Sequence, residues 1–124
     1  MGDDAQVIDD ALTALKEIQR EYRNEPVASL AARMSQQIRP TMAFDQSLKE
    51  RERIYERTPK EFTEAAAKAL AKRGPGYKTP VFKCLEDFEK CKNSSSSKHL
   101  CRAALAICIG KHLLPFVRHE QSET

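Results

Sequence analysis

The sequence predicts an all-α protein of about six helices, and three observations support this fold class. Apolar residues recur at spacings of three and four along most of the chain, as they do on the buried side of a helix. Only 4 glycines occur in 124 residues and 31% of the residues are charged, a composition that does not suit the many turns of a sandwich or barrel. No segment alternates between apolar and polar residues over the length of a strand.

The first two helices are separated by a proline. The first is expected from about Asp4 to Arg23. One stripe along it is apolar: Ile8, Leu12, Leu15, Ile18 and Tyr22. Pro26 suits the first turn of the second helix, where the N–H that proline lacks would have no partner within the helix. The second helix must end by Arg39, because Pro40 disfavours helical geometry in the residue before it.

The next two helices are also expected to meet at a proline. A third helix is predicted over about residues 42–57. Residues 58–61 then form a start signal for a fourth helix. In this signal Thr58 is the capping residue, Pro59 takes the first helical position and Glu61 completes a capping box. The sequence therefore predicts a break in the helix at Thr58.

The last two helices are expected to form a hairpin. The fifth helix is predicted over about 79–92 and starts with a second threonine–proline pair. An asparagine and four serines make a turn at 93–97, and the sixth helix follows over about 98–114. Because the turn is short, the two helices should pack antiparallel.

The length allows one compact domain. Within it we expect an N-terminal helical region at 1–73, a linker at 74–79, the hairpin at 80–117 and a polar tail at 118–124.

All four cysteines lie in the predicted hairpin, at Cys84, Cys91, Cys101 and Cys108. Both pairs have C-x6-C spacing, and seven residues turn a helix through about 700°, so the two cysteines of each helix share a face. In an antiparallel hairpin, residues equally distant from the turn lie opposite each other. Cys84 then faces Cys108, and Cys91 faces Cys101, which is the registry that two nested disulfides need.

Three uses of the cysteines fit this registry. The first is a pair of disulfides, Cys84–Cys108 and Cys91–Cys101. The second is four reduced cysteines that serve as small buried side chains, as expected in a cytosolic protein. The third is a metal site that uses all four thiolates, although the two cysteines of one helix lie about 10 Å apart along its axis. His112, one turn beyond Cys108, is a further ligand candidate for a smaller site.

The twin cysteine pairs on an antiparallel hairpin resemble the coiled-coil-helix–coiled-coil-helix (CHCH) proteins. The resemblance covers about residues 81–114, with C-x6-C in place of the family's usual spacing. It implies oxidative folding in the mitochondrial intermembrane space without a cleaved presequence. It also implies the role of an accessory subunit or assembly factor of a mitochondrial complex.

Targeting signals are absent from the N-terminus, which is acidic and has no apolar core of a signal peptide. The longest apolar run, 103–109, is too short to span a membrane. The CHCH resemblance implies the mitochondrial intermembrane space or another oxidising compartment, and the absence of a targeting signal fits this location. It fits the alternative, the cytoplasm, equally well.

Charge patterning suggests a protein partner rather than nucleic acid, because 21 basic residues are nearly balanced by 18 acidic ones. Lys49, Arg53 and Arg57 fall four residues apart and form a basic ridge that an acidic partner could bind. The bland interpretation of this ridge is a solvated helix face.

No catalytic motif occurs, although Cys108 and His112 have the i, i+4 spacing that a Cys–His nucleophile pair could use. We expect a non-catalytic interaction or scaffold protein without a cofactor. The alternatives are a thiol redox or metal-binding protein that uses the four cysteines, and a bacterial cytosolic interaction domain with reduced cysteines.

Overall fold

The computed structural model describes residues 2–38, 48–74, 76, 79–94 and 97–115. Within these ranges it contains five helices and no strand, which confirms the all-α prediction. The helices are α1 (Gly2–Glu21), α2 (Pro26–Ile38), α3 (Leu48–Ala71), α4 (Thr79–Ser94) and α5 (Lys98–Leu113). The predicted tail at 118–124, and parts of the linker and of the third helix, lie outside the described residues.

The expected break at Thr58 is wrong, because α3 runs through it as one helix. Pro59 lies inside this helix and cannot donate a backbone hydrogen bond to the carbonyl of Tyr55. Thr58 does not cap a helix: its hydroxyl donates back to the carbonyl of Ile54. The continuity of α3 is the reason that five helices are found instead of six.

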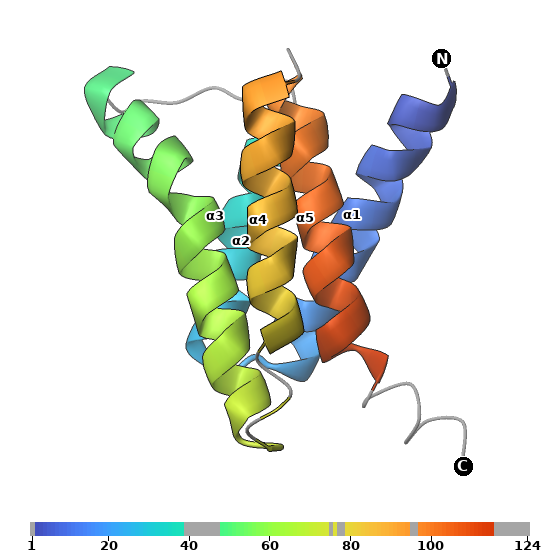
Figure 1. Ribbon diagram of the computed structural model, residues 1–124, viewed down its shortest axis with the longest axis vertical. Coiled ribbons are helices and arrows are strands. Elements are labelled where there is room, and N and C mark those ends of the chain that lie inside the picture. The colour runs from blue at the N-terminus through green and yellow to red at the C-terminus, as the bar shows by residue number, and fades with distance from the viewer. Residues whose placement is uncertain (1, 39–47, 75, 77–78, 95–96, 116–124) are drawn as a thin grey trace.

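Helix α5 is the centre of the bundle and contacts all four other helices. Figure 1 shows α4 and α5 antiparallel in the middle, α1 and α3 on the two flanks, and α2 behind. Half of the sixteen residues of α5 are buried, as expected for a helix that packs against several neighbours. Its buried residues are Cys101, Arg102, Ala103, Leu105, Ala106, Ile109, Gly110 and Leu113.

Helix α1 approaches α5 closely at Gly110. A Cβ atom at Gly110 would lie 3.2 Å from the Cβ of Ala14, so the small residues on both sides allow the contact. Near the ends of the two helices, the buried Tyr22 hydroxyl donates to the Leu113 carbonyl at 2.7 Å. Burial raises the pKa of the Tyr22 phenol above its usual value, although Arg73 opposes this shift.

A buried arginine connects α2, α3 and α5. Arg102 is 1% exposed, and its Nη2 donates to the Tyr55 carbonyl at 2.5 Å. This is the carbonyl that Pro59 leaves without a helical donor. The Nε of Arg102 donates to Oε1 of Gln37 at 3.3 Å. Gln37 in turn donates to the Thr58 hydroxyl at 2.9 Å, which completes the link between the three helices.

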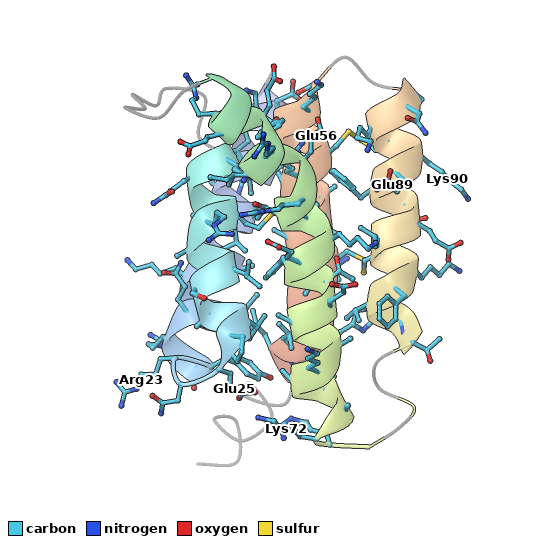
Figure 2. All side chains as sticks on the ribbon, turned by 90° about the vertical axis from the view of Figure 1, so that its left-hand side faces the viewer. Arg23, Glu25, Glu56, Lys72, Glu89 and Lys90 are labelled. Carbon is cyan, nitrogen blue, oxygen red and sulfur yellow. A yellow bond between two sulfur atoms is a disulfide. The ribbon has the colours of Figure 1, made fainter. Side chains whose placement is uncertain are left out.

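Aromatic rings cover the Arg102 guanidinium, whose central carbon lies 3.4 Å from the Tyr55 ring centroid and 5.4 Å from that of Phe88. Burial lowers the pKa of Arg102, while the nearby charges of Glu56 and Glu89 act in the opposite direction. These two carboxylates lie on the exposed sides of α3 and α4 (Figure 2). The stacking, the Tyr55 carbonyl and the Gln37 side chain thus hold a charge that has no carboxylate bonded to it among the described residues.

Candidate functional site

The cysteines of the hairpin form the two disulfides that the registry predicts. Cys84 and Cys108 are bonded with their Cα atoms 5.8 Å apart, and Cys91 and Cys101 with theirs 5.7 Å apart. Both distances fall in the usual range for a disulfide, about 4.4–6.8 Å. The equal distance of each pair from the turn was therefore sufficient to predict the connectivity.

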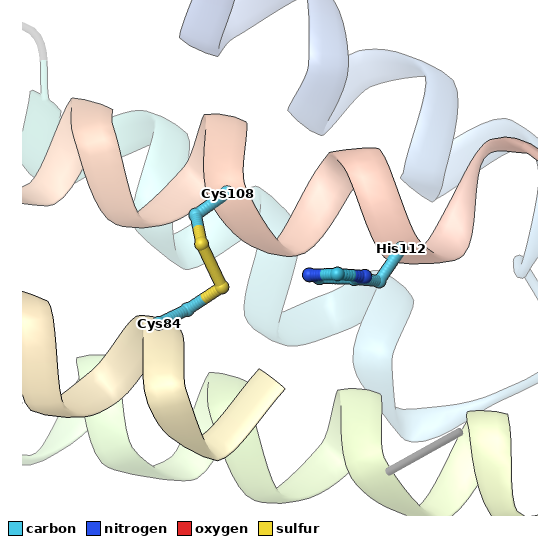
Figure 3. A group of neighbouring side chains, drawn as sticks. All are labelled: Cys84, Cys108 and His112. Atoms are coloured by element: carbon cyan, nitrogen blue, oxygen red, sulfur yellow. A yellow bond between two sulfur atoms is a disulfide. The ribbon is translucent and has the colours of Figure 1, made fainter. Parts of the chain in front are cut away.

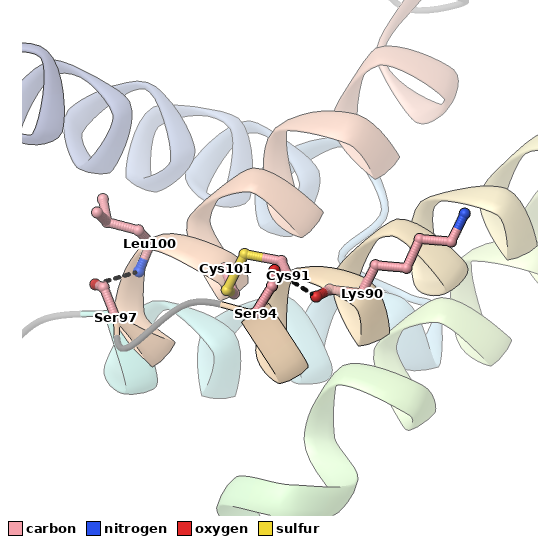
Figure 4. The surroundings of a disulfide bond; sticks show 6 residues. All are labelled: Lys90, Cys91, Ser94, Ser97, Leu100 and Cys101. Carbon is pink, nitrogen blue, oxygen red and sulfur yellow. Dashed lines mark hydrogen bonds between the residues drawn. A yellow bond between two sulfur atoms is a disulfide. The ribbon is translucent and has the colours of Figure 1, made fainter.

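Serine side chains support the helix ends at the turn (Figure 4). The hydroxyl of Ser97 caps α5 by accepting from the backbone N–H of Leu100 at 3.3 Å. At the end of α4, the Ser94 hydroxyl donates to the Lys90 carbonyl at 2.8 Å. Helix α4 consequently continues two residues beyond the expected end at Lys92, and the Cys91–Cys101 bond lies directly next to the turn.

Each disulfide joins a buried cysteine to a half-buried one. Cys84 and Cys101 are 2% and 0% exposed, whereas Cys108 and Cys91 are half-buried. The four sulfurs form two separate pairs along the hairpin. A metal site of four thiolates would instead need all four sulfurs around one point.

His112 lies beside the outer disulfide. It follows Cys108 by four residues on α5, so both side chains project from the same side of the helix. Figure 3 shows its ring between α4 and α5, directed toward the Cys84–Cys108 bond. The two sulfurs and one ring nitrogen lie within 4.8 Å of one another. In the disulfide form neither sulfur is a thiolate, so nucleophilic or metal chemistry at this group requires reduction first.

The predicted basic ridge lies on α3. Arg53 and Arg57 are exposed, while the side chain of Lys49 is outside those that the structure describes. Arg57 forms a loose ion pair with Glu61, with 3.7 Å between Nε and Oε2. Glu61 also pairs with Arg33 of α2 at 3.4 Å. Binding of an acidic partner at the ridge stays a prediction.

Two notable side chains were not predicted from the sequence. Phe82 on α4 is 41% exposed, and no other large apolar side chain among the described residues is as exposed. Arg102 is the one charged residue between Leu100 and Gly110, a lone charge inside an apolar helix. That isolation was a usable signal, because a charge on the buried side of a helix needs specific partners.

At the other end of the bundle, Lys72 of α3 pairs with Glu25 in the turn between α1 and α2, at 3.0 Å (Figure 2).

Among the described residues, no helix has the length and apolar character that a membrane span requires. No protein-family model, curated protein or solved structure matches the sequence.

Proposed function

We propose that this protein is a non-catalytic interaction or scaffold protein that works in its disulfide-bonded form. The observation that carries the proposal is the use of all four cysteines as two nested staples between α4 and α5. Stable disulfides are typical of oxidising compartments. The CHCH resemblance makes the mitochondrial intermembrane space the proposed location, and an accessory subunit or assembly factor of a mitochondrial complex the proposed role.

The basic ridge of α3 is the proposed contact with the partner. Arg53 and Arg57 are exposed one turn apart, a spacing that presents two guanidinium groups on one side of the helix. Guanidinium groups bind carboxylates through two parallel hydrogen bonds, in a bidentate geometry. The partner we propose therefore carries an acidic segment. Among the described residues, the one ion pair of Arg57 is its exposed pair with Glu61, so releasing Arg57 to a partner costs little.

The test is affinity capture with the purified, oxidised protein as bait. Wild type is compared with the double variant Arg53→Glu/Arg57→Glu. The matched control is Lys16→Glu/Arg20→Glu, which makes the same change in charge at the same spacing on exposed positions of α1. Circular dichroism should show that both variants keep the helical fold, since exposed ion pairs contribute about 0–1 kcal/mol.

Partners held by wild type and by the α1 control, and lost by the α3 variant, would support the proposal. A monodisperse monomer that captures nothing, or capture unaffected by the α3 variant, would overturn it. Four free thiols in the native protein would favour the cytosolic interaction domain instead.

One observation favours a second candidate, a thiol redox or metal-binding function. It is the position of His112 next to the outer disulfide.

A further inference from the structure

We propose that Cys84, Cys108 and His112 form a redox-controlled zinc site, closed by the disulfide and opened by reduction. This inference goes beyond the proposed interaction role and does not depend on it. It starts from three ligand atoms, two sulfurs and one imidazole nitrogen, that already lie within 4.8 Å of one another. They come from α4 and α5, which also pack directly against each other.

The spacing of these atoms suits a zinc ion once the sulfur–sulfur bond is broken. Zinc binds thiolates at about 2.3 Å and imidazole at about 2.0–2.1 Å, so its tetrahedral ligands lie roughly 3.3–3.8 Å from one another. Each sulfur reaches a new position by rotation about one side-chain bond. The Cα atoms of Cys84 and Cys108, 5.8 Å apart, can therefore keep their places. His112 is half-buried and is directed at the sulfurs, which leaves the fourth ligand position for water (Figure 3).

The chemistry of the three ligands selects zinc over harder cations. Two thiolates and one neutral imidazole are ligands of zinc, whereas magnesium and calcium prefer oxygen. A site with three protein ligands and one open position is the pattern of an exchangeable or reactive zinc. The same ligands accept cobalt(II), which provides a spectroscopic probe.

The switch is a balanced two-electron step. A dithiol reductant transfers two electrons and two protons to the Cys84–Cys108 bond, which gives two thiols, and is itself oxidised to a disulfide. Zinc binding then releases both thiol protons and leaves two zinc-bound thiolates. In the reverse direction, a disulfide oxidant takes two electrons from the thiolates and, with two protons from the solvent, is reduced to two thiols. The Cys84–Cys108 bond is restored and the ion is released.

The inner pair has no equivalent third ligand among the described residues. The nearest histidine in sequence is His99, two residues before Cys101, and its Nδ1 is engaged with the Gln37 carbonyl at 3.2 Å. We therefore expect Cys91 and Cys101 to cross-link the two helices and not to bind a metal ion. This difference between two otherwise similar cysteine pairs supplies the control for the test.

The experiment uses the full chain, oxidised or fully reduced with a phosphine, and titrates it with zinc alone or cobalt(II) alone. The reduced protein should bind one cobalt per chain with the strong near-ultraviolet absorption of thiolate-to-cobalt charge transfer, and zinc should displace it. The oxidised protein should show neither signal. Absence of binding by the reduced protein, or equal binding by the oxidised protein, would overturn the proposal.

Variants of the reduced protein then assign the ligands. His112→Ala should weaken zinc binding by at least about tenfold, the lower end of what loss of even an outer-shell partner costs. His99→Ala and Cys91→Ser should leave the affinity unchanged. An unaffected His112→Ala variant would overturn the proposal, and loss of binding in Cys91→Ser would indicate a four-thiolate site in its place.

A second measurement needs no variants. Zinc should protect Cys84 and Cys108 of the reduced wild-type chain from alkylation while Cys91 and Cys101 still react, as mapped by mass spectrometry. Equal reactivity of all four cysteines in the presence of zinc would contradict the proposed ligand set. The capture experiment on the basic ridge uses the oxidised protein, so its outcome is independent of this one.

Discussion

The Arg102 guanidinium connects three helices that are distant in the sequence. Its acceptors, the Tyr55 carbonyl and the Gln37 side chain, lie 47 and 65 residues away along the chain. The Tyr55 carbonyl needs this donor because Pro59 has no backbone N–H. Pro59 and Arg102 should therefore be energetically coupled, although one lies in α3 and the other in α5.

A double-mutant cycle tests this coupling. Arg102→Met should lower the free energy of unfolding by about 2–4 kcal/mol, because the Tyr55 carbonyl and the Gln37 amide oxygen lose a buried donor. In the Pro59→Ala background a backbone N–H is available again for the Tyr55 carbonyl. The cost of Arg102→Met should then fall by about 1 kcal/mol. Denaturant unfolding of the oxidised protein measures all four corners, and strictly additive costs would contradict the coupling.

The buried phenol of Tyr22 predicts a dependence of stability on pH. Burial raises the pKa of Tyr22, so the folded state holds its proton at a pH where the unfolded chain, with a pKa of about 10, has begun to lose it. The contribution of the protonated Tyr22 phenol to the free energy of unfolding is fully present below about pH 10. It is lost as the pH rises through the pKa of Tyr22 in the folded state. Tyr22→Phe should cost about 1 kcal/mol at pH 8 by removing the bond to the Leu113 carbonyl.

The pH dependence itself provides the control. The difference in unfolding free energy between wild type and Tyr22→Phe should narrow between pH 8 and about pH 11. A constant difference over this range would show that Tyr22 does not titrate differently in the folded and unfolded states.

At the scale of the element, the two cysteines of each disulfide lie at equal distances from the turn of the hairpin, which places them opposite each other on α4 and α5. The two disulfides close loops of different size, with sequence separations of 24 for the outer bond and 10 for the inner one. In the chain-entropy view, a cross-link stabilises more when it closes a longer loop in the unfolded chain. The outer bond should therefore contribute more to stability than the inner one, even though both join the same two helices.

Paired serine variants measure this difference. Cys84→Ser/Cys108→Ser should lower the free energy of unfolding by about 3.1 kcal/mol, and Cys91→Ser/Cys101→Ser by about 2.4 kcal/mol, because in each variant the other disulfide still restricts the unfolded chain. Thermal and denaturant unfolding without reductant would give both values. A larger loss for the inner pair would contradict the loop-closure account of the hairpin.

Helix α3 shows where local sequence signals mislead. The segment 58–61 has the residues of a capping box with proline at the first position, and this pattern predicts a helix start. The helix continues because partners outside the segment satisfy its carbonyls: Arg102 binds that of Tyr55, and Gln37 reaches that of Ile54. No pattern within α3 contains this information, since both donors come from other helices.

At the scale of the whole molecule, one apolar core includes residues from both the N-terminal helices and the hairpin. The helical class and the disulfide pairing could be predicted because they depend on periodicity and on distance from a turn. The proximity of His112 to Cys108 could also be predicted, from their spacing on one helix. The partners of Arg102, the exposure of Phe82 and the central place of α5 could not, because they depend on how five helices pack around one another.

The pairing of the four cysteines is tested most directly by peptide mapping of the native protein under non-reducing conditions, after alkylation of any free thiol. We predict no alkylation before reduction, alkylation of all four cysteines after reduction, and two cross-linked peptide pairs that contain Cys84 with Cys108 and Cys91 with Cys101. Four alkylated cysteines without reduction, or a Cys84–Cys91 link, would contradict the stapled hairpin and the proposals that depend on it.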